Sequence, residues 1–140
     1  MLRPIDLDQW TRTLWAECRG EPLLGQRAVA FVIFNRYKRP GWWSRQKDDI
    51  PDDTIQAVVR DKAQFSCWFD SQLYNLLQVP TTDPVYVDLW NICLDVWYGV
   101  IEDPTKGATH YHTLDSHPDW SRGLQPCLEI GNHRFFNNVP

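Results

Sequence analysis

An uninterrupted apolar run at residues 28–34 (Ala-Val-Ala-Phe-Val-Ile-Phe) constrains this chain more than any other feature. A helix that is apolar on all sides is stable only when other parts of the protein surround it. Pro22 favours the first turn of a helix, where its missing N–H costs no hydrogen bond. The sequence therefore predicts a buried central helix from Pro22 to about Tyr37, around which the rest of the chain packs.

The size and composition of the chain indicate one ordinary domain. Its 140 residues suffice for a single core, and the apolar and charged fractions, 43% and 23%, are typical of globular proteins. The formal net charge of -4 argues against a nucleic-acid-binding protein, which normally carries a basic surface. We expect a single domain over residues 1–140, monomeric and without a cofactor.

Apolar spacing and helix-ending residues predict helices on both sides of the central one. Residues 5–18 carry apolar side chains two to four positions apart, and Gly20 suits a left-handed C-cap. Asp83-Pro84 begins a long helix that ends at Gly99. The remaining segments of this part are a long loop at 38–53 and short helices at 54–60 and 71–78.

The pattern changes near the C-terminus, where β-forming residues alternate over 109–113. Residues 127–130 and 133–136 flank Gly131-Asn132, a candidate type I′ hairpin turn. The predicted fold class is α+β and mainly α, with a small antiparallel β element toward the C-terminus.

The four cysteines form no CxxC pair, which argues against zinc-ribbon and thioredoxin-like sites. The sequence shows no export signal and no apolar stretch long enough to span a bilayer. We therefore expect free thiols, synthesis in the cytoplasm and no membrane anchor.

Glu17 is the first candidate for a chemical role. It lies in the last turn of the first predicted helix, where the negative end of the helix dipole disfavours a carboxylate. If Trp15 or other apolar groups also exclude water, its pKa rises and it can stay protonated near neutral pH. Such a carboxyl can serve as the general acid that protonates a glycosidic oxygen. The alternative is a solvent-exposed or arginine-paired glutamate of an ordinary helix.

Two histidines, His110 and His112, lie two residues apart and share one face of a predicted strand. With His117, His133 or a carboxylate they could form a zinc site, but the chain has no HExxH motif, and we expect no metal. The alternative is one buried, hydrogen-bonded histidine beside another that lines a cleft. His133 and Arg134 on the terminal hairpin could likewise line a polar pocket.

The chain contains 8 tryptophans, a side chain that either fills a core or stacks on ring-shaped ligands. Trp42, Trp43, Trp68 and Trp120 lie in or beside predicted loops, and the first three are candidates for stacking on sugar rings. Trp90 and Trp97 lie on the long predicted helix and are expected in the core.

Several separated motifs resemble, in the right order, the SleB-like cell wall hydrolases. These are the catalytic domains of spore cortex-lytic enzymes and their bacterial and phage relatives. The motifs are AECRGEP at 16–22 with Gly25-Gln26 and Asn35-Arg36, then QFSCW at 64–68, DPTKGATHYH at 103–112, PDW at 118–120 and IGNHRFF at 130–136. Cys18, Lys106 and Phe136 depart from the usual alanine, glycine and tyrosine, and none of them removes a proposed catalytic group.

The resemblance implies a lysozyme-like fold and cleavage of peptidoglycan between N-acetylmuramic acid and N-acetylglucosamine, mostly by lytic transglycosylases. By motif, the catalytic glutamate falls on Glu17. A lytic transglycosylase uses one carboxyl, first as acid and then as base to the sugar's own 6-hydroxyl, whereas usual glycosidases need two. The residues expected to bind the glycan strand are Arg19, Glu21, Gln64, Ser66, Trp68, His110, Tyr111, His112 and His133.

Two other classes of protein stay open at this point. One is a zinc amidase that cuts between the lactyl group and the peptide, with His110, His112 and His133 as ligands and Glu17 as base. The other is a non-catalytic glycan-binding module that uses the tryptophans. Because no wall-binding module or export signal is visible, we expect a phage endolysin that a holin releases to act on the cell wall.

Overall fold

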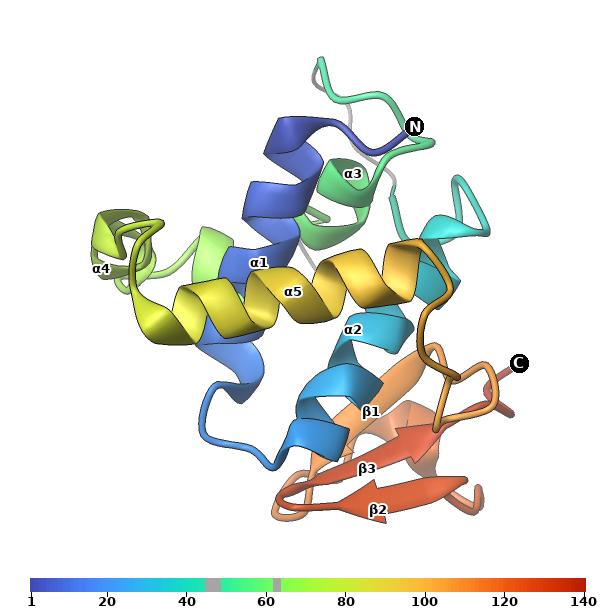
Figure 1. The fold of residues 1–140 in the computed structure, drawn as a ribbon. Helices are drawn as coiled ribbons and strands as arrows, with labels where there is room; N and C mark the ends of the chain where they lie inside the picture. The colour runs from blue at the N-terminus through green and yellow to red at the C-terminus, as the bar shows by residue number, and fades with distance from the viewer. Residues whose placement is uncertain (45–48, 62–63) are drawn as a thin grey trace.

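The computed structural model describes residues 1–44, 49–61 and 64–140, and helices form most of the regular structure (Figure 1). The helices are α1 (Pro4–Cys18), α2 (Leu23–Tyr37), α3 (Ile55–Val59), α4 (Leu73–Gln78) and α5 (Pro84–Trp97). Within the described residues the order also contains the 3₁₀ helices η1 (Ser66–Trp68) and η2 (Asp119–Ser121) and the strands β1 (His110–Thr113), β2 (Leu128–Ile130) and β3 (His133–Phe136). The predicted class, α+β and mainly α, is confirmed.

Helix α2 is the centre of the helical part, as the apolar run predicted. Residues 28–33 are all buried, and α1, α3 and α5 each contact this helix. Pro22 is the N-cap residue of α2, so the helix begins one position later than predicted. None of the helices within the described residues is long and apolar enough to cross a membrane.

Helix α1 ends differently from the prediction. Arg19 closes it in the right-handed region, with φ -58°, and Gly20 does not adopt a positive φ. The N–H of Glu21 donates to the carbonyl of Cys18 at 2.9 Å, which turns the chain without any left-handed residue. The predicted left-handed cap at Gly20 is therefore wrong.

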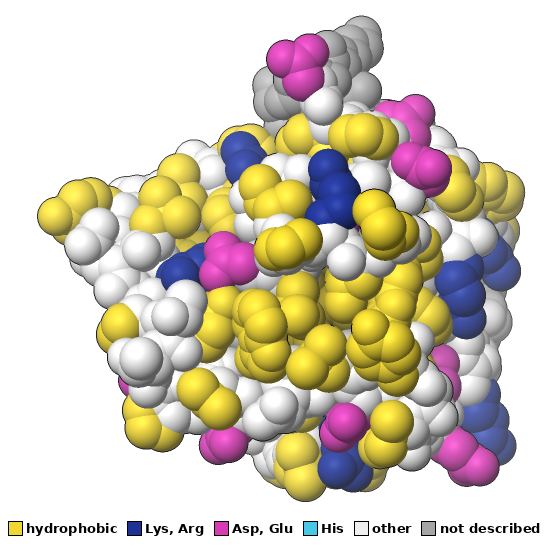
Figure 2. All heavy atoms as spheres, turned by 45° about the horizontal axis from the view of Figure 1, so that its top comes forward, with side chains coloured by type: hydrophobic (Ala, Val, Ile, Leu, Met, Phe, Trp, Pro, Cys, Tyr) yellow, Lys and Arg dark blue, Asp and Glu magenta, His cyan; other side chains and the backbone are white. Residues whose placement is uncertain are grey.

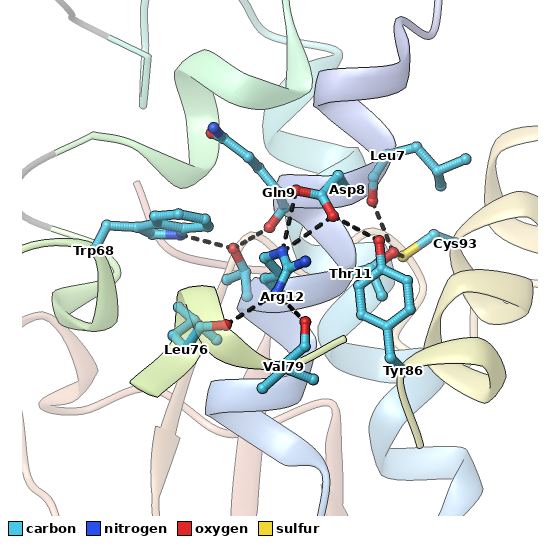
Figure 3. A network of polar contacts seen from close by, with 11 residues as sticks. Leu7, Asp8, Gln9, Thr11, Arg12, Trp68, Leu76, Val79, Tyr86 and Cys93 are labelled. Carbon is cyan, nitrogen blue, oxygen red and sulfur yellow. Dashed lines mark hydrogen bonds and ion pairs between the residues drawn. The ribbon is translucent and has the colours of Figure 1, made fainter. Parts of the chain in front are cut away.

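Arg12 connects α1 to the segments around it (Figure 3). Its Nη1 donates to the carbonyls of Leu76 and Val79, at 2.9 and 2.8 Å, where α4 ends. Its Nε donates to Asp8 at 3.0 Å, and the hydroxyl of Tyr86 on α5 donates to the same carboxylate at 2.6 Å. These contacts satisfy orphan carbonyls at a helix C-terminus and hold α4 and α5 against α1.

Helix α5 begins as predicted, because the side chain of Asp83 accepts a hydrogen bond from the N–H of Tyr86. Trp90 and Trp97 were predicted to be core residues. Both pack against the core, but their side chains are only partly buried. Figure 2 shows hydrophobic side chains gathered over the middle of one face, where α5 lies in Figure 1.

The strands form one antiparallel sheet in the order β1-β3-β2. Tyr111 and Phe135 are directly opposite each other on its inner face, and His112 and Arg134 are opposite on its outer face. In the β2–β3 turn only Gly131 has a positive φ, 56°. A type I′ turn needs positive φ at both central residues, so that predicted turn type is wrong.

Candidate active site

Glu17 lies in the last turn of α1 and faces a cleft of about 440 Å³. The end of α2, the residues before η1, strand β1 and the loop after β1 enclose this cleft. Its lining comprises Glu17, Arg36, Gln64, Phe65, His110, Tyr111, His112, Thr113, Ser116, Pro118 and Trp120. Among these described residues Glu17 is the one carboxyl group.

Burial raises the pKa of the Glu17 carboxyl above its ordinary value. The hydroxyl of Tyr111 donates to its Oε1 at 2.5 Å, and this bond and the charge of Arg36 partly oppose the rise. The prediction that loss of water raises this pKa is thus confirmed. The apolar walls are Phe65, Tyr111 and Trp120, and Trp15 does not line the cleft.

Tyr111 stays protonated, since burial and the neighbouring Glu17 raise the pKa of its phenol well above the usual value. It therefore acts as the donor in the bond to Glu17. Its ring packs against the rings of His133 and Phe135, with centroids 5.0 and 5.6 Å away. The inner face of the sheet thus fixes the direction of the hydroxyl.

Arg36 is a cleft residue that belongs to one of the motifs but was not predicted as a site residue. It is buried, its Nε donates to the carbonyl of Thr109 at 2.7 Å, and its Nη1 donates to Gln64 Oε1 at 2.9 Å. Burial lowers its pKa to about 10, so it remains charged at neutral pH. A charged residue near the end of an otherwise apolar helix was the signal that could have found it.

His110 and His112 line the cleft, as predicted. The ring of Trp120 lies 4.8 Å from that of His110 and 5.7 Å from that of His112. Burial, helped by the charge of Arg36, lowers the pKa of His110 to about 4, so this imidazole is neutral at physiological pH. Trp120, which was expected in or beside a loop but was not named as a binding residue, is thus part of the cleft.

The histidines do not form the zinc site that the amidase alternative requires. His133 is opposite Thr113 in the sheet register and so projects from the inner face, whereas His110 and His112 project from the outer face. Within residues 1–44, 49–61 and 64–140 no group of three or more His, Cys, Asp or Glu side chains is arranged to hold a metal ion. Because neighbouring residues of a strand project from opposite faces of the sheet, the three histidines of the proposed ligand set do not share one face.

Glu21 and His133 support the hairpin instead of lining the cleft. Glu21 Oε1 accepts the backbone N–H of Asn132 at 2.8 Å and lies 3.3 Å from His133 Nδ1. Burial lowers the pKa of His133, and the carboxylate of Glu21 partly opposes this. Neither residue is among those that line the cleft, and their contact with the glycan strand stays a prediction.

Other predicted site residues also lie elsewhere. Trp68 is buried, with 3% of its surface exposed, and its indole N–H donates to Thr13 at 2.9 Å, so its ring cannot stack on a sugar. Arg19 is exposed and lies over the ring of Trp15, 3.8 Å from its centroid. Ser66 is exposed at the start of η1 and outside the cleft lining. Gln64 is in the cleft, and its contact with substrate stays a prediction.

The tryptophans of the long loop are placed near the rim. Trp43 is half-buried, with its ring 5.7 Å from that of His110, and Trp42 is 59% exposed beside it. Their stacking on sugars stays a prediction. The part of the loop at residues 45–48 lies outside the described residues.

A mainly helical domain whose Glu17 carboxyl faces a cleft at the junction of helices and a small sheet is a lysozyme-like arrangement. Comparison with known proteins defines the family. Residues 20–136 match the Cell Wall Hydrolase family, and the chain belongs to that family. The resemblance seen in the motifs is confirmed.

Curated relatives and solved structures agree with this assignment. A spore cortex-lytic enzyme of Halalkalibacterium halodurans is 30% identical over 94% of this chain and 34% of its own length. One of Bacillus subtilis is 26% identical over 93% of this chain and 37% of its own length. The chain therefore spans between a third and two fifths of these two relatives.

The solved structures are similar over almost the whole chain. The catalytic domain of the germination-specific lytic transglycosylase SleB from Bacillus anthracis is 28% identical, with a TM-score of 0.69 over 95% of this chain and 94% of that one. The catalytic domain of the Bacillus cereus SleB protein is 27% identical, with a TM-score of 0.73 over 96% of this chain and 91% of that one. The predicted lysozyme-like fold is confirmed.

Proposed function

We propose that this protein cleaves the glycan strand of peptidoglycan as a lytic transglycosylase, with Glu17 as its one catalytic carboxyl. The observation that carries this proposal is the composition of the cleft, in which Glu17 is the one carboxyl group among the described lining residues. Its raised pKa suits a group that must first give a proton and then take one. The similarity to the SleB catalytic domains, of which that from Bacillus anthracis is a lytic transglycosylase, supports the same reaction class.

The reaction uses the Glu17 carboxyl twice. It first protonates the oxygen that links N-acetylmuramic acid to N-acetylglucosamine, and the bond from that oxygen to the anomeric carbon of the muramyl sugar breaks. The resulting carboxylate then takes the proton of the muramyl 6-hydroxyl, whose oxygen bonds to the anomeric carbon. The product is a 1,6-anhydro end, Glu17 is protonated again, and no water is consumed.

The neighbours of Glu17 suit both halves of this cycle. Burial favours the protonated acid, whereas the Tyr111 hydroxyl and the Arg36 charge stabilise the carboxylate formed after the first proton transfer. His110, whose pKa burial lowers to about 4, offers hydrogen-bonding groups to sugar hydroxyls or N-acetyl groups without adding charge beside the carboxyl, and His112 lines the same cleft. A second carboxylate that would activate water is not required.

The test is mass spectrometry of the sugar ends released from purified peptidoglycan. Anhydro ends are expected from the wild-type protein, and reducing ends or freed peptides with intact glycan would contradict the proposal. Glu17→Gln should lower cleavage by about 10³-fold, the usual scale for losing a general acid, while binding to peptidoglycan survives. Glu102→Gln, at an exposed glutamate outside the cleft, is the matched control. Cleavage by Glu17→Gln at the wild-type rate would indicate another acid, and no cleavage by the wild-type protein would indicate a non-catalytic module.

The biological setting stays a prediction of the sequence. We propose an endolysin role in phage lysis, with a holin as release factor, and this is tested by expressing the chain in bacteria with and without a holin. Lysis only in the presence of the holin is expected. Lysis by the chain alone would contradict that role but leave the proposed chemistry standing.

A further inference from the structure

A second hollow of about 560 Å³ lies beside the catalytic cleft. His112 and Pro118 line both, so the two spaces meet along a shared wall. Trp120 lines the cleft, and the next two residues, Ser121 and Arg122, line the second hollow. A molecule bound in the cleft can therefore extend a branch into the neighbouring space.

The floor of the second hollow is a row of polar side chains across the sheet. His112, Arg134 and Glu129 are paired directly across β1, β3 and β2, which places all three on the outer face. Arg134 Nε donates to Glu129 Oε2 at 2.8 Å, with 36% and 50% of the two side chains exposed. These charged groups are thus accessible to a ligand.

The opposite wall is the loop after β1, and Trp120 anchors it. Besides its two histidine contacts, the Trp120 ring lies 5.1 Å from that of Phe136 on the sheet. Arg122, two residues later, is 84% exposed and pairs with Asp119 at 3.1 Å. Among the described residues that line the hollow, Arg122 and Arg134 supply guanidinium groups and Glu129 supplies a carboxylate, while the partner of Arg122, Asp119, is outside that lining.

We propose that this second hollow binds the charged peptide branch of the muramyl residue while the catalytic cleft holds the sugars. The inference rests on the proposed function. N-acetyl sugars are neutral once the lactyl carboxyl is joined to the peptide, so the peptide carries the carboxylates and amines of this substrate. Guanidinium groups recognise carboxylates by charge-assisted hydrogen bonds, and Glu129 suits an amine. The aromatic cleft offers faces for sugar rings, in contrast to the charged row beside it.

The experiment compares two substrates: soluble glycan strands that retain their peptides and the same strands after enzymatic removal of the peptides. The double variant Arg122→Gln/Arg134→Gln should raise KM for the peptide-bearing strands by about tenfold, the factor for one lost charge-assisted hydrogen bond. Its KM and kcat for the stripped strands should equal those of the wild type, which also shows that the variant is folded.

Lys106→Gln is the matched control, because it removes a positive charge from an exposed residue outside both hollows. It should behave as wild type on both substrates. A rise in KM of equal size for both kinds of strand, or no rise for either, would overturn the inference and leave the proposed function intact. If the wild-type protein cleaves neither kind of strand, the proposed function itself fails, and the peptide assignment falls with it.

Discussion

Tyr111 Oη donates a 2.5 Å hydrogen bond to Glu17 Oε1 and joins β1 to the end of α1 across 94 positions of sequence. A carboxyl with one fixed hydrogen-bond donor keeps its free oxygen in a constant direction. The ring of Tyr111 is in turn held by His133 and Phe135 of β3. The sheet, although small, thereby controls the position of the proposed catalytic group.

Removing the Tyr111 hydroxyl should change the pH dependence of cleavage. The bond stabilises the carboxylate and so lowers the pKa of Glu17, which means that Tyr111→Phe raises that pKa further. Because the general acid must be protonated, the alkaline limb of the pH–rate profile should move to higher pH. Cleavage at the optimum should fall by roughly tenfold or more from the loss of positioning.

The matched control is Tyr74→Phe, at a side chain that is 72% exposed. It should leave both the limb and the rate unchanged. A Tyr111→Phe protein with lower activity but an unmoved alkaline limb would show that the hydroxyl does not act through the Glu17 proton.

Glu17→Gln should stabilise the folded protein near neutral pH. The folded state holds the Glu17 proton more tightly than the unfolded chain, because burial raises the pKa of this carboxyl above 4.5. The stability from this group is complete below 4.5 and is lost as pH rises through the higher folded pKa. Glutamine keeps an oxygen for Tyr111 and has no proton to lose.

Thermal unfolding of the two proteins over a pH series measures this effect. The Tm of Glu17→Gln should exceed that of the wild type at neutral pH, and the difference should shrink as the pH falls toward 4.5. A Tm difference that does not depend on pH would assign the change to packing instead of protonation.

Gly131→Ala should disturb the hairpin through two separate effects. Its φ of 56° is unfavourable for alanine, and an added Cβ would stand 2.5 Å from Glu21 Oε1 and 3.0 Å from Pro22 Cδ. Gly99→Ala is the matched control, since Gly99 has φ 71° and nothing within 4 Å of the added Cβ. We expect a loss of about 1 kcal/mol in the free energy of unfolding for Gly99→Ala and a larger loss for Gly131→Ala. If urea unfolding shows equal losses of unfolding free energy for the two variants, the Glu21 side chain moves away from the added Cβ without destabilising the fold.

Arg12→Met should destabilise the fold although methionine can occupy much of the same space. The substitution removes the donors to the Leu76 and Val79 carbonyls and leaves Asp8 without its cation (Figure 3). We expect the free energy of unfolding to fall by about 2–4 kcal/mol in urea denaturation. Arg122→Met, which removes one partner of an exposed ion pair, should cost less than about 1 kcal/mol. Similar losses for the two variants would mean that α4 does not depend on Arg12.

Local signals predicted much of the secondary structure. Asp83-Pro84 marked the start of α5, the apolar run marked the central helix, and Gly131-Asn132 marked the connection of the terminal hairpin. Each signal depends only on residues that are close in sequence: a side chain that caps a helix, a proline that lacks an N–H at the first helical position, or the spacing of apolar residues. The left-handed cap at Gly20 and the type I′ turn failed because several turn geometries suit the same glycine. A local hydrogen bond from the Glu21 N–H to the Cys18 carbonyl closes the first turn, and the second turn has a positive φ at Gly131 alone.

The sequence by itself determined the helices, the class of the fold, the family and the position of Glu17 at a helix end, because these depend on local bonding and motif spacing. Tertiary structure decided which side chains share the cleft. Trp68 is buried in the core, Glu21 contacts the hairpin next to His133, and Arg36 lines the cleft. Burial and the face of a strand depend on segments far apart in the chain, and those long-range contacts set both the pKa of Glu17 and its partner Tyr111.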